Sequence, residues 1–514
     1  MTSPFLLLAL TGCWWKAAPG PAAFETAAAP VVPVGVMADG PITYLQVTVA
    51  AGTAREPVGQ QGVSWLTAHL LRDGGAGDRS PEEVEALLDA LGTDVEVVVD
   101  RELITLRTRC LHEDVGTLAG LLADMVLRPR LDPVTFRRLR DAQVDHLERG
   151  VLSSDEDLGM TVLEDWVFEG HPYGHPLQGR AGTLPVLELD AVEAFLEDRY
   201  VRSAVTLGIA GPAVRADGRI DPAGPGGEGL VALRDALSTL APRQSASTTP
   251  RRLPATPGRE LLVVEASTES TGIHFGHGLD LSRDHEDWPA LVLAFTAFGE
   301  HRQSHGRLYR ELRGARGLNY GDYAYVEVYR QVGWSATRET GTARFQNLFY
   351  TWLRPTSPEN GPFALKAAVS MVEDLVAEGL GPEEFATTRD YLKGRVALWA
   401  DHPGRRLGWA VEADALGLPD PIDTLPAALD GLTMEGVNAA LERHIRPDEL
   451  RIVVVTGDGE AFLSAVLGEG PTPRVRPDEA PAVASSEAAQ DAAWADLDLG
   501  LDRARVVGTD ALLR

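Results

Sequence analysis

One apolar segment holds the residues whose spacing comes nearest to a catalytic arrangement. Residues 62–73 read GVSWLTAHLLRD and contain a single histidine, His69. A helix that binds a catalytic zinc ion in the order His-x-x-Glu-His needs two histidines four residues apart and a glutamate that acts as general base. Here Trp65 stands four residues before His69, and Ala68 stands directly before it. The segment therefore lacks one metal ligand and the base.

A second pair of histidines has the spacing of metal ligands. His301 and His305 are four residues apart, with Glu300 beside them, and this spacing places two ligands on one face if the segment is a helix. Gly299 and Gly306 bracket the segment, which favours a loop. We therefore favour a loop without zinc and keep a metal site at this pair as an alternative.

The other reactive side chains of the chain body are interpreted as structural. His171 and His175, in HPYGHP, are loop residues beside prolines. The chain has two cysteines, so it lacks a framework of disulfides. Cys110 lies in the strand-like run LITLRTRC and is expected to be a buried apolar residue.

The N-terminus carries a separate signal. The apolar run Phe5–Leu10 is too short to span a bilayer, and its last residue begins the sequence Leu10-Thr11-Gly12-Cys13. This order resembles the lipobox of bacterial lipoproteins, which predicts cleavage before Cys13 and a lipid on its sulfur. Residues 1–33 are thus expected to form a lipoprotein signal and an Ala/Pro-rich tether. The chain is then held by lipid in a bacterial cell envelope, in the periplasm or at the outer membrane.

Composition excludes one broad class of function. The chain has 514 residues, with 75 acidic and 47 basic side chains and a formal net charge of −28. General nucleic-acid binding needs a basic surface, so no nucleic-acid partner is expected. Hydrophobic residues make up 44% of the chain, which is ordinary for a globular protein with a sizeable core.

The order of predicted elements divides the chain into two similar halves. Each half begins with strands, continues into helices and closes on a strand. We expect a first domain at 34–221, a linker at 222–257 and a second domain at 258–473, followed by an acidic low-complexity tail at 474–514 that is disordered until near Trp494. The fold class is α+β, with two homologous α/β-sandwich domains that face each other as a clamshell. Each domain has a mixed, largely antiparallel sheet covered by helices.

Local signals identify elements that would position a site. Ser80 followed by a proline and two glutamates predicts a helix start, with Ser80 as the N-cap. Residues 93–110 read as a pair of strands, and one of the two is expected to form the edge of its sheet. A peptide can add to such an edge as an extra strand.

The chain resembles the pitrilysin/insulinase family of zinc peptidases, in the two-domain form that includes the subunits of the mitochondrial processing peptidase. The resemblance spans roughly Val34–Gly459. Its segments follow the family order and comprise 62–75 (GVSWLTAHLLRDGG), 122–147, 170–184 (GHPYGHPLQGRAGTL), 306–325 (GRLYRELRGARGLNYGDYAY) and 432–458.

The resemblance implies a metal site that this chain has lost. Of the zinc helix only His69 remains, since Trp65 replaces the first histidine and Ala68 replaces the base. The family's third ligand, a glutamate, is expected near Asp145, with His146 adjacent. His69 and Asp145 together offer two ligands, fewer than the three that hold a catalytic zinc. We therefore expect no cofactor in this chain and no catalytic residue of its own.

The resemblance also implies a retained pair in the second domain. Arg313 and Tyr320 match the family's arginine and tyrosine in kind and spacing. In the family this pair faces the zinc and holds the substrate carbonyl and the developing oxyanion. Arg316, one turn beyond Arg313, is a less suited substitute. The neighbouring Gly317 fits a helix end followed by a turn.

Three functions remain to be weighed. The leading hypothesis is a non-catalytic subunit that binds peptide and supplies Arg313 and Tyr320 to a zinc-bearing homologue, as a heterodimer. The alternative is an envelope lipoprotein that binds peptide or acts as a scaffold without an enzymatic partner. The second alternative is an active metallopeptidase with an atypical site, built from His69, Asp145 and His146 or from the pair His301 and His305.

Overall fold

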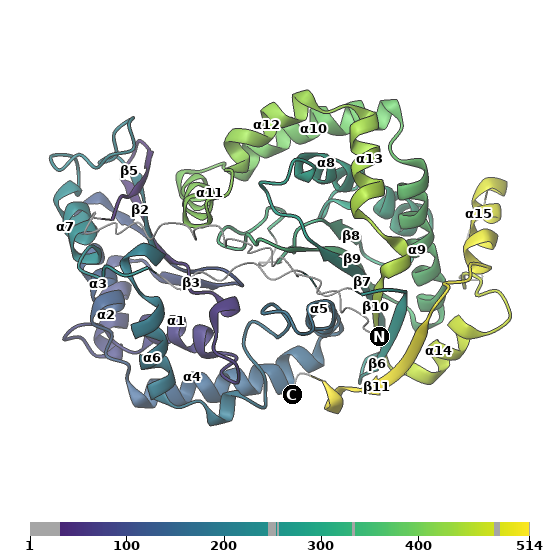
Figure 1. Ribbon diagram of the computed structural model, residues 1–514, viewed down its shortest axis with the longest axis horizontal. Coiled ribbons are helices and arrows are strands. Elements are labelled where there is room, and N and C mark those ends of the chain that lie inside the picture. The colour runs from purple at the N-terminus through teal and green to yellow at the C-terminus, as the bar shows by residue number, and fades with distance from the viewer. Residues whose placement is uncertain (1–30, 245–252, 254–255, 331–334, 477–483, 513–514) are drawn as a thin grey trace, which may run out of the picture.

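The computed structural model describes residues 31–244, 253, 256–330, 335–476 and 484–512. Two lobes lie side by side, each built on one mixed sheet with helices packed on it (Figure 1). The predicted α+β fold with two sandwich-like domains is therefore confirmed. Within the described residues, none of the helices combines the length and the apolar character needed to cross a bilayer. The predicted lipid-bearing Cys13 lies outside the described residues.

The sheet of the first lobe has the order β1-β5-β2-β4-β3. Its strands are β1 (Val34–Met37), β2 (Ile42–Val49), β3 (Val95–Val99), β4 (Ile104–Leu111) and β5 (Val205–Gly211). The β1–β5 pair is parallel, and the other pairs are antiparallel. Of the two candidate edge strands, β3 is at the edge and β4 lies inside the sheet.

The sheet of the second lobe has the order β11-β6-β10-β7-β9-β8. Its strands are β6 (Glu260–Glu265), β7 (Thr271–Leu279), β8 (Asp322–Tyr325), β9 (Asn347–Thr356), β10 (Arg451–Thr456) and β11 (Arg503–Gly508). Strand β6 pairs in parallel with β10 and β11, and the remaining pairs are antiparallel.

Helices cover both sheets. The first half contributes α1 (Val63–Asp73), α2 (Pro81–Leu91), α3 (Val115–Leu127), α4 (Pro133–Asp145), α5 (Asp155–Val167), α6 (Leu189–Arg199) and α7 (Gly227–Leu237). The second half contributes α8 (Trp288–Gly299), α9 (Gly361–Glu378), α10 (Pro382–Trp399), α11 (Pro403–Leu416), α12 (Pro421–Gly431), α13 (Met434–His444), α14 (Gly459–Leu467) and α15 (Ser485–Ala495). The predicted cap of α2 is present, because the Ser80 hydroxyl accepts from the Glu83 N–H while the Glu83 carboxylate accepts from the Ser80 N–H.

The two lobes exchange helices. Helix α5, from the first half, packs on strands β7 and β10 of the second sheet, and α11, from the second half, packs on β5, β2 and β1 of the first sheet. At one contact the approach is close, since a Cβ on Gly159 of α5 would lie 2.2 Å from Cδ2 of His274 in β7. At the other, Leu407 and Val411 of α11 are buried against Ala210. The halves of the sequence are therefore not independent bodies.

The predicted linker and tail need correction. Helix α7 lies within the expected linker 222–257 and packs on α3, with Leu230 and Leu233 buried. The expected disordered tail contains α15 and β11, and β11 extends the second sheet beside β6. Both segments are rich in alanine and charge, and each still buries one apolar side. In α15 that side centres on Trp494, which is 3% exposed.

Candidate functional site

The residues predicted to replace a zinc site, Trp65, Ala68 and His69, lie on α1. The rings of Trp65 and His69 are in contact, with centroids 3.7 Å apart, so the indole occupies the place where a second histidine would face the metal. Burial, with the positive charge of Arg72 nearby, lowers the pKa of His69 to about 4. Ala68 is fully buried and has no group that accepts a proton. The helix therefore offers one neutral histidine packed against an aromatic ring.

The position of the third ligand lies at the end of α4. Asp145 is the last residue of this helix, and its carboxylate pairs with Arg149 at 3.0 Å. His146 opens a π-helical turn, His146–Gly150, which continues α4. Such turns are frequent at functional sites, and this one begins at the position where the third ligand was predicted. The residues present do not fit a zinc ion, since Asp145 is engaged with Arg149 and His69 with Trp65.

A buried glutamate that the sequence did not mark holds the start of α1. The carboxylate of Glu56 accepts hydrogen bonds from the N–H groups of Gly62 and Ser64, and from the Ser64 hydroxyl at 2.6 Å. Nε2 of His175 lies 3.6 Å from it. Burial raises the pKa of Glu56 to about 7, although these hydrogen bonds oppose the rise. Glu56 thus fixes the helix that carries the vestigial site.

The predicted pair lies in the second lobe, with Arg313 on a π-helical turn, Tyr309–Ala315, and Tyr320 in the loop that follows. The guanidinium of Arg313 sits 4.7 Å from the ring centroid of Tyr320 and 4.8 Å from that of Tyr309, and it donates to the Tyr309 hydroxyl. Tyr320 is 61% exposed. The structure therefore brings Arg313 and Tyr320 together and leaves the Tyr320 ring exposed to solvent.

Local backbone geometry sets this arrangement. Gly317 has a φ of +64°, and its N–H donates to the Arg313 carbonyl at 2.9 Å. A left-handed residue at this point ends the helical turn and suits glycine. The side-chain amide of Asn319 then donates to the Asp322 carboxylate at 2.5 Å and to the Arg354 carbonyl at 3.1 Å. These contacts hold the loop that presents Tyr320.

The Tyr320 loop also touches the exchanged helix. Arg354 lies with its guanidinium 5.5 Å from the Tyr320 ring centroid, and it pairs with Glu156 of α5 at 2.8 Å. The start of α5 is held again by the Ser270 hydroxyl, which donates to Asp155 at 2.6 Å. The first half of the chain therefore supports the site residues of the second half.

The alternative prediction, a metal site formed by His301 and His305 on one face of a helix, is wrong. Residues 301–305 form no helix, and Arg302 has a φ of +56°. The two imidazoles have separate surroundings. Nδ1 of His301 is 2.6 Å from the Tyr325 hydroxyl, and its ring stacks on Tyr329. The ring of His305 meets Tyr391 instead. The less suited cation, Arg316, is buried and pairs with Asp491 at 2.6 Å, so it has a structural role.

Within the described residues, one group of three side chains could hold a metal ion: His285, Asp287 and His444. It lies where α13 ends and α8 begins, apart from the residues predicted as ligands. The Asp287 carboxylate already accepts from Arg443 at 2.7 Å and lies 2.8 Å from Nε2 of His444. Nδ1 of His285 accepts from the Asp287 N–H. These contacts explain the cluster as a link between the end of α13 and the start of α8, and we assign no metal to it.

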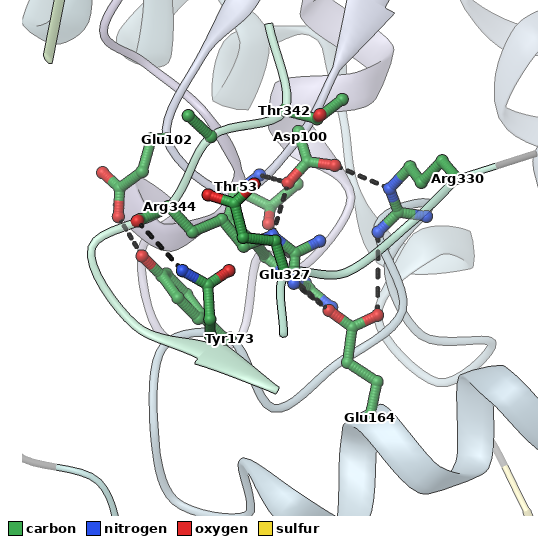
Figure 2. A network of polar contacts seen from close by, with 12 residues as sticks. Thr53, Asp100, Glu102, Glu164, Tyr173, Glu327, Arg330, Thr342 and Arg344 are labelled. Atoms are coloured by element: carbon green, nitrogen blue, oxygen red, sulfur yellow. Dashed lines mark hydrogen bonds and ion pairs between the residues drawn. The ribbon is translucent and has the colours of Figure 1, made fainter. Parts of the chain in front are cut away.

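A buried ionic network joins the lobes (Figure 2). Asp100, after β3, receives hydrogen bonds from Arg344 at 2.8 Å and from Arg330 at 2.6 Å, and both arginines belong to the second half. Glu164 of α5 bonds Arg344 and pairs with Arg101 at 3.1 Å. Burial alone would raise the pKa of Glu164, but the surrounding arginines outweigh it and hold that pKa well below its usual range. The network therefore ties the two lobes with charged side chains in their ionised forms.

Comparisons with known proteins find similar sequences and similar folds. Residues 37–179 match the family described as Insulinase (Peptidase family M16). An uncharacterized zinc protease of Mycobacterium tuberculosis is 23% identical over 405 residues, which cover 78% of this chain and 84% of that protein. An uncharacterized zinc protease of Bacillus subtilis is 20% identical over 416 residues, which cover 80% of this chain and 92% of that protein.

Solved structures share the fold. The inactive domain of a peptidase M16 from Pseudomonas fluorescens superposes with a TM-score of 0.69 at 21% identity, covering 82% of this chain and 94% of its own. A protease from Helicobacter pylori also superposes with a TM-score of 0.69, at 13% identity, covering 83% of this chain and 98% of its own. At these identities the likeness concerns the fold.

Proposed function

Because the chain belongs to the insulinase (M16) peptidase family, we propose that it is a non-catalytic peptidase-like subunit that binds peptide beside a zinc-bearing homologue. The observation that carries the proposal is a contrast between α1, in the first lobe, and the Arg313–Tyr320 pair, in the second lobe. On α1 the ring of Trp65 covers His69, and a buried alanine stands where a base is needed. On the second lobe Arg313 and Tyr320 are together, and Tyr320 is exposed.

The chemistry of this chain is then electrophilic. The homologue supplies zinc and a general base. Arg313 and Tyr320 donate hydrogen bonds to the carbonyl oxygen of the bound peptide, which becomes negative as the carbonyl is attacked. Arg313 is held between two tyrosine rings before substrate binds, so little reorganisation is needed. Donors that are arranged in advance are the ones that lower the barrier most.

The proposal includes a setting for the complex. A lipid on Cys13 would hold the chain in a bacterial envelope, and the following Ala/Pro-rich residues would act as a tether. Peptides are the expected substrates. A net charge of −28 also disfavours anionic partners such as nucleic acids at long range.

The experiment is a pull-down of this chain from its native envelope, with mass spectrometry of the proteins that copurify and a peptidase assay of the eluate with and without a chelator. We expect a homologue with His-x-x-Glu-His in equal amount, and chelator-sensitive activity that this chain alone lacks. No homologue and no activity would favour a binding or scaffold protein instead. Chelator-sensitive activity from the purified chain alone would contradict the non-catalytic assignment.

A further inference from the structure

A cleft of about 720 Å³ lies between the two lobes, away from the Arg313–Tyr320 pair. One wall is the face of the first sheet, along β2, β4 and the edge strand β3. The other wall is formed by residues 335–340 and by the start of α11, the helix donated by the second half. A volume of this size is in the range of small-ligand sites, so the cleft admits a short stretch of peptide.

Strand register places a set of polar side chains on the wall of the cleft that the first sheet forms. Tyr44 of β2 stands opposite Arg109 of β4, and Gln46 stands opposite Arg107. On the other side of β4, Arg107 stands opposite Glu96 of β3. Since alternate residues of a strand face the same side, these five side chains share one face, and all five line the cleft.

The acidic groups of the cleft are already matched by arginines. Arg107 bonds Glu96 at 2.6 Å and Glu339 at 2.7 Å. Asp94, the remaining acid of the lining, bonds Arg72 at 2.6 Å, and Arg72 lies outside the cleft. Each carboxylate of the lining thus has an arginine partner within the protein, although Glu96 and Glu339 share Arg107.

Two cations of the lining are not matched in this way. Arg109 is exposed, and within the described residues it has no ion pair. Arg405, in the first turn of α11, meets the carboxylate of Asp401 at 3.6 Å, where Asp401 is 51% exposed. His402 stacks against Tyr44 between them, and burial lowers its pKa. Arg405 also donates to the Ser335 hydroxyl at 3.4 Å. Arg109 and the remaining donors of Arg405 therefore line the same opening.

We propose that this cleft binds the carboxylate groups of an acidic peptide segment. A guanidinium presents a planar set of donors that suits a carboxylate, and the bonds are stronger because both groups are charged. The edge strand β3 forms one rim, so an extended peptide can pair with its backbone while its carboxylates reach Arg109 and Arg405. At physiological salt, charges beyond about 8 Å are largely screened, so the arginines of the lining act on a bound carboxylate more strongly than the distant acidic residues of the chain do.

The inference extends the peptide-binding part of the proposed function and does not involve Arg313 or Tyr320. Its test uses the full chain alone, without a partner. Short fluorescent peptides of one length are titrated and followed by anisotropy: a glutamate-rich peptide with an amidated C-terminus, a neutral peptide with a free C-terminus, the same neutral peptide amidated, and a lysine-rich peptide. Comparing the first two peptides shows whether the chain binds side-chain carboxylates or a terminal carboxylate.

The decisive variant is Arg109→Gln combined with Arg405→Gln. Loss of two charged hydrogen bonds predicts binding of the preferred carboxylate peptide that is weaker by roughly tenfold or more. The matched control is Arg215→Gln combined with Arg219→Gln, which removes two exposed arginines with ion pairs at 3.6 and 3.9 Å to Asp217. This control should bind like the unmodified chain.

Each outcome decides the inference. Binding of the glutamate-rich peptide that is lost in the Arg109/Arg405 variant and kept in the control supports it, and binding of the free C-terminus alone overturns it. Equal binding of the acidic, neutral and basic peptides, or equal loss in both double variants, overturns it. Neither overturning result affects the role proposed for Arg313, because that role is measured as activity of the reconstituted pair.

Discussion

The guanidinium of Arg313 lies 4.7 Å from the ring centroid of Tyr320, the residue seven positions later that the family pattern pairs with it. A third residue completes the arrangement. Tyr309 covers the guanidinium at 4.8 Å and accepts a hydrogen bond from it. A cation over an aromatic face is held by the negative charge of the ring face. Arg313 is therefore fixed by its neighbours in the absence of substrate.

Tyr309 is then a positioning residue for Arg313. Replacing it with leucine removes both the ring and the hydroxyl, and we expect kcat/KM of the reconstituted pair to fall by about tenfold, as a cation–π contact and a charged hydrogen bond are lost. Tyr309→Phe keeps the ring and should recover most of the rate. If the leucine and phenylalanine variants show the same rate, the ring does not position the arginine.

The lowered pKa of His69 predicts how the stability of the fold depends on pH. Its pKa is lowered to about 4 in the folded chain, against an ordinary value of 6.5. Between these values the unfolded chain takes up a proton and the folded chain does not, so this histidine reduces stability as pH falls from about 7 to about 4. The variant Trp65→Ala uncovers the imidazole of His69, and the pKa of His69 should then rise toward its ordinary value. A titration of the His69 ring protons by NMR measures this, and an unchanged pKa would refute the covering role of Trp65.

Glu164 tests the network between the lobes. Because this carboxyl is buried among arginines, Glu164→Gln leaves buried cations without a partner and should cost about 3–5 kcal/mol of unfolding free energy. The native pKa is depressed, so the glutamate stabilises the fold above about pH 4.5, and that contribution is lost as pH falls further. Denaturant unfolding at neutral and acid pH measures both effects.

The control for Glu164 lies on the same helix. Glu156 pairs with Arg354 at 2.8 Å, and both side chains are partly exposed. Glu156→Gln should cost less than about 1 kcal/mol, as is usual for ion pairs near solvent. Equal losses in the two variants would contradict the view that the buried network joins the lobes.

Gly159 tests the close approach of α5 to the second sheet. An alanine Cβ would come within 2.2 Å of the buried ring of His274, whose Nδ1 is 2.8 Å from the Tyr350 hydroxyl. We expect Gly159→Ala to lower the free energy of unfolding by about 1–3 kcal/mol through overpacking. The control is Gly394→Ala in α10, where nothing lies within 4 Å, and it should stabilise by about 0.5–1 kcal/mol. A stabilised Gly159→Ala would show that the helix contact is loose.

Local signals in the sequence predicted much of the fold. The predicted strand pair at 93–110, the Ser80 cap and the glycine after Arg313 each depend on neighbouring residues, and each is found as expected. The degenerate zinc helix was visible for the same reason. Its substituted positions lie within one turn of His69.

What the sequence missed depends on contacts between distant residues. Asp100 and Arg344 are separated by 244 positions, and no periodic pattern links them. The sequence of α15 is polar and predicted a disordered tail. In the structure the helix is held by Trp494, because the guanidinium of Arg316 lies 4.2 Å from the indole ring centroid. Tyr309 lies four residues before Arg313, a spacing that carries no catalytic signal until the π-helical turn brings the two together.

The most direct test of the account is the activity of this chain reconstituted with its zinc-bearing homologue. Arg313→Ala, or Tyr320→Phe, should lower kcat of the pair by roughly 10²–10³, the loss seen when an oxyanion donor is removed. The matched control is Arg310→Ala, an exposed arginine of the same turn, which should retain full activity. If Arg313→Ala and Tyr320→Phe leave kcat unchanged while the complex forms normally, this chain does not supply the electrophilic pair.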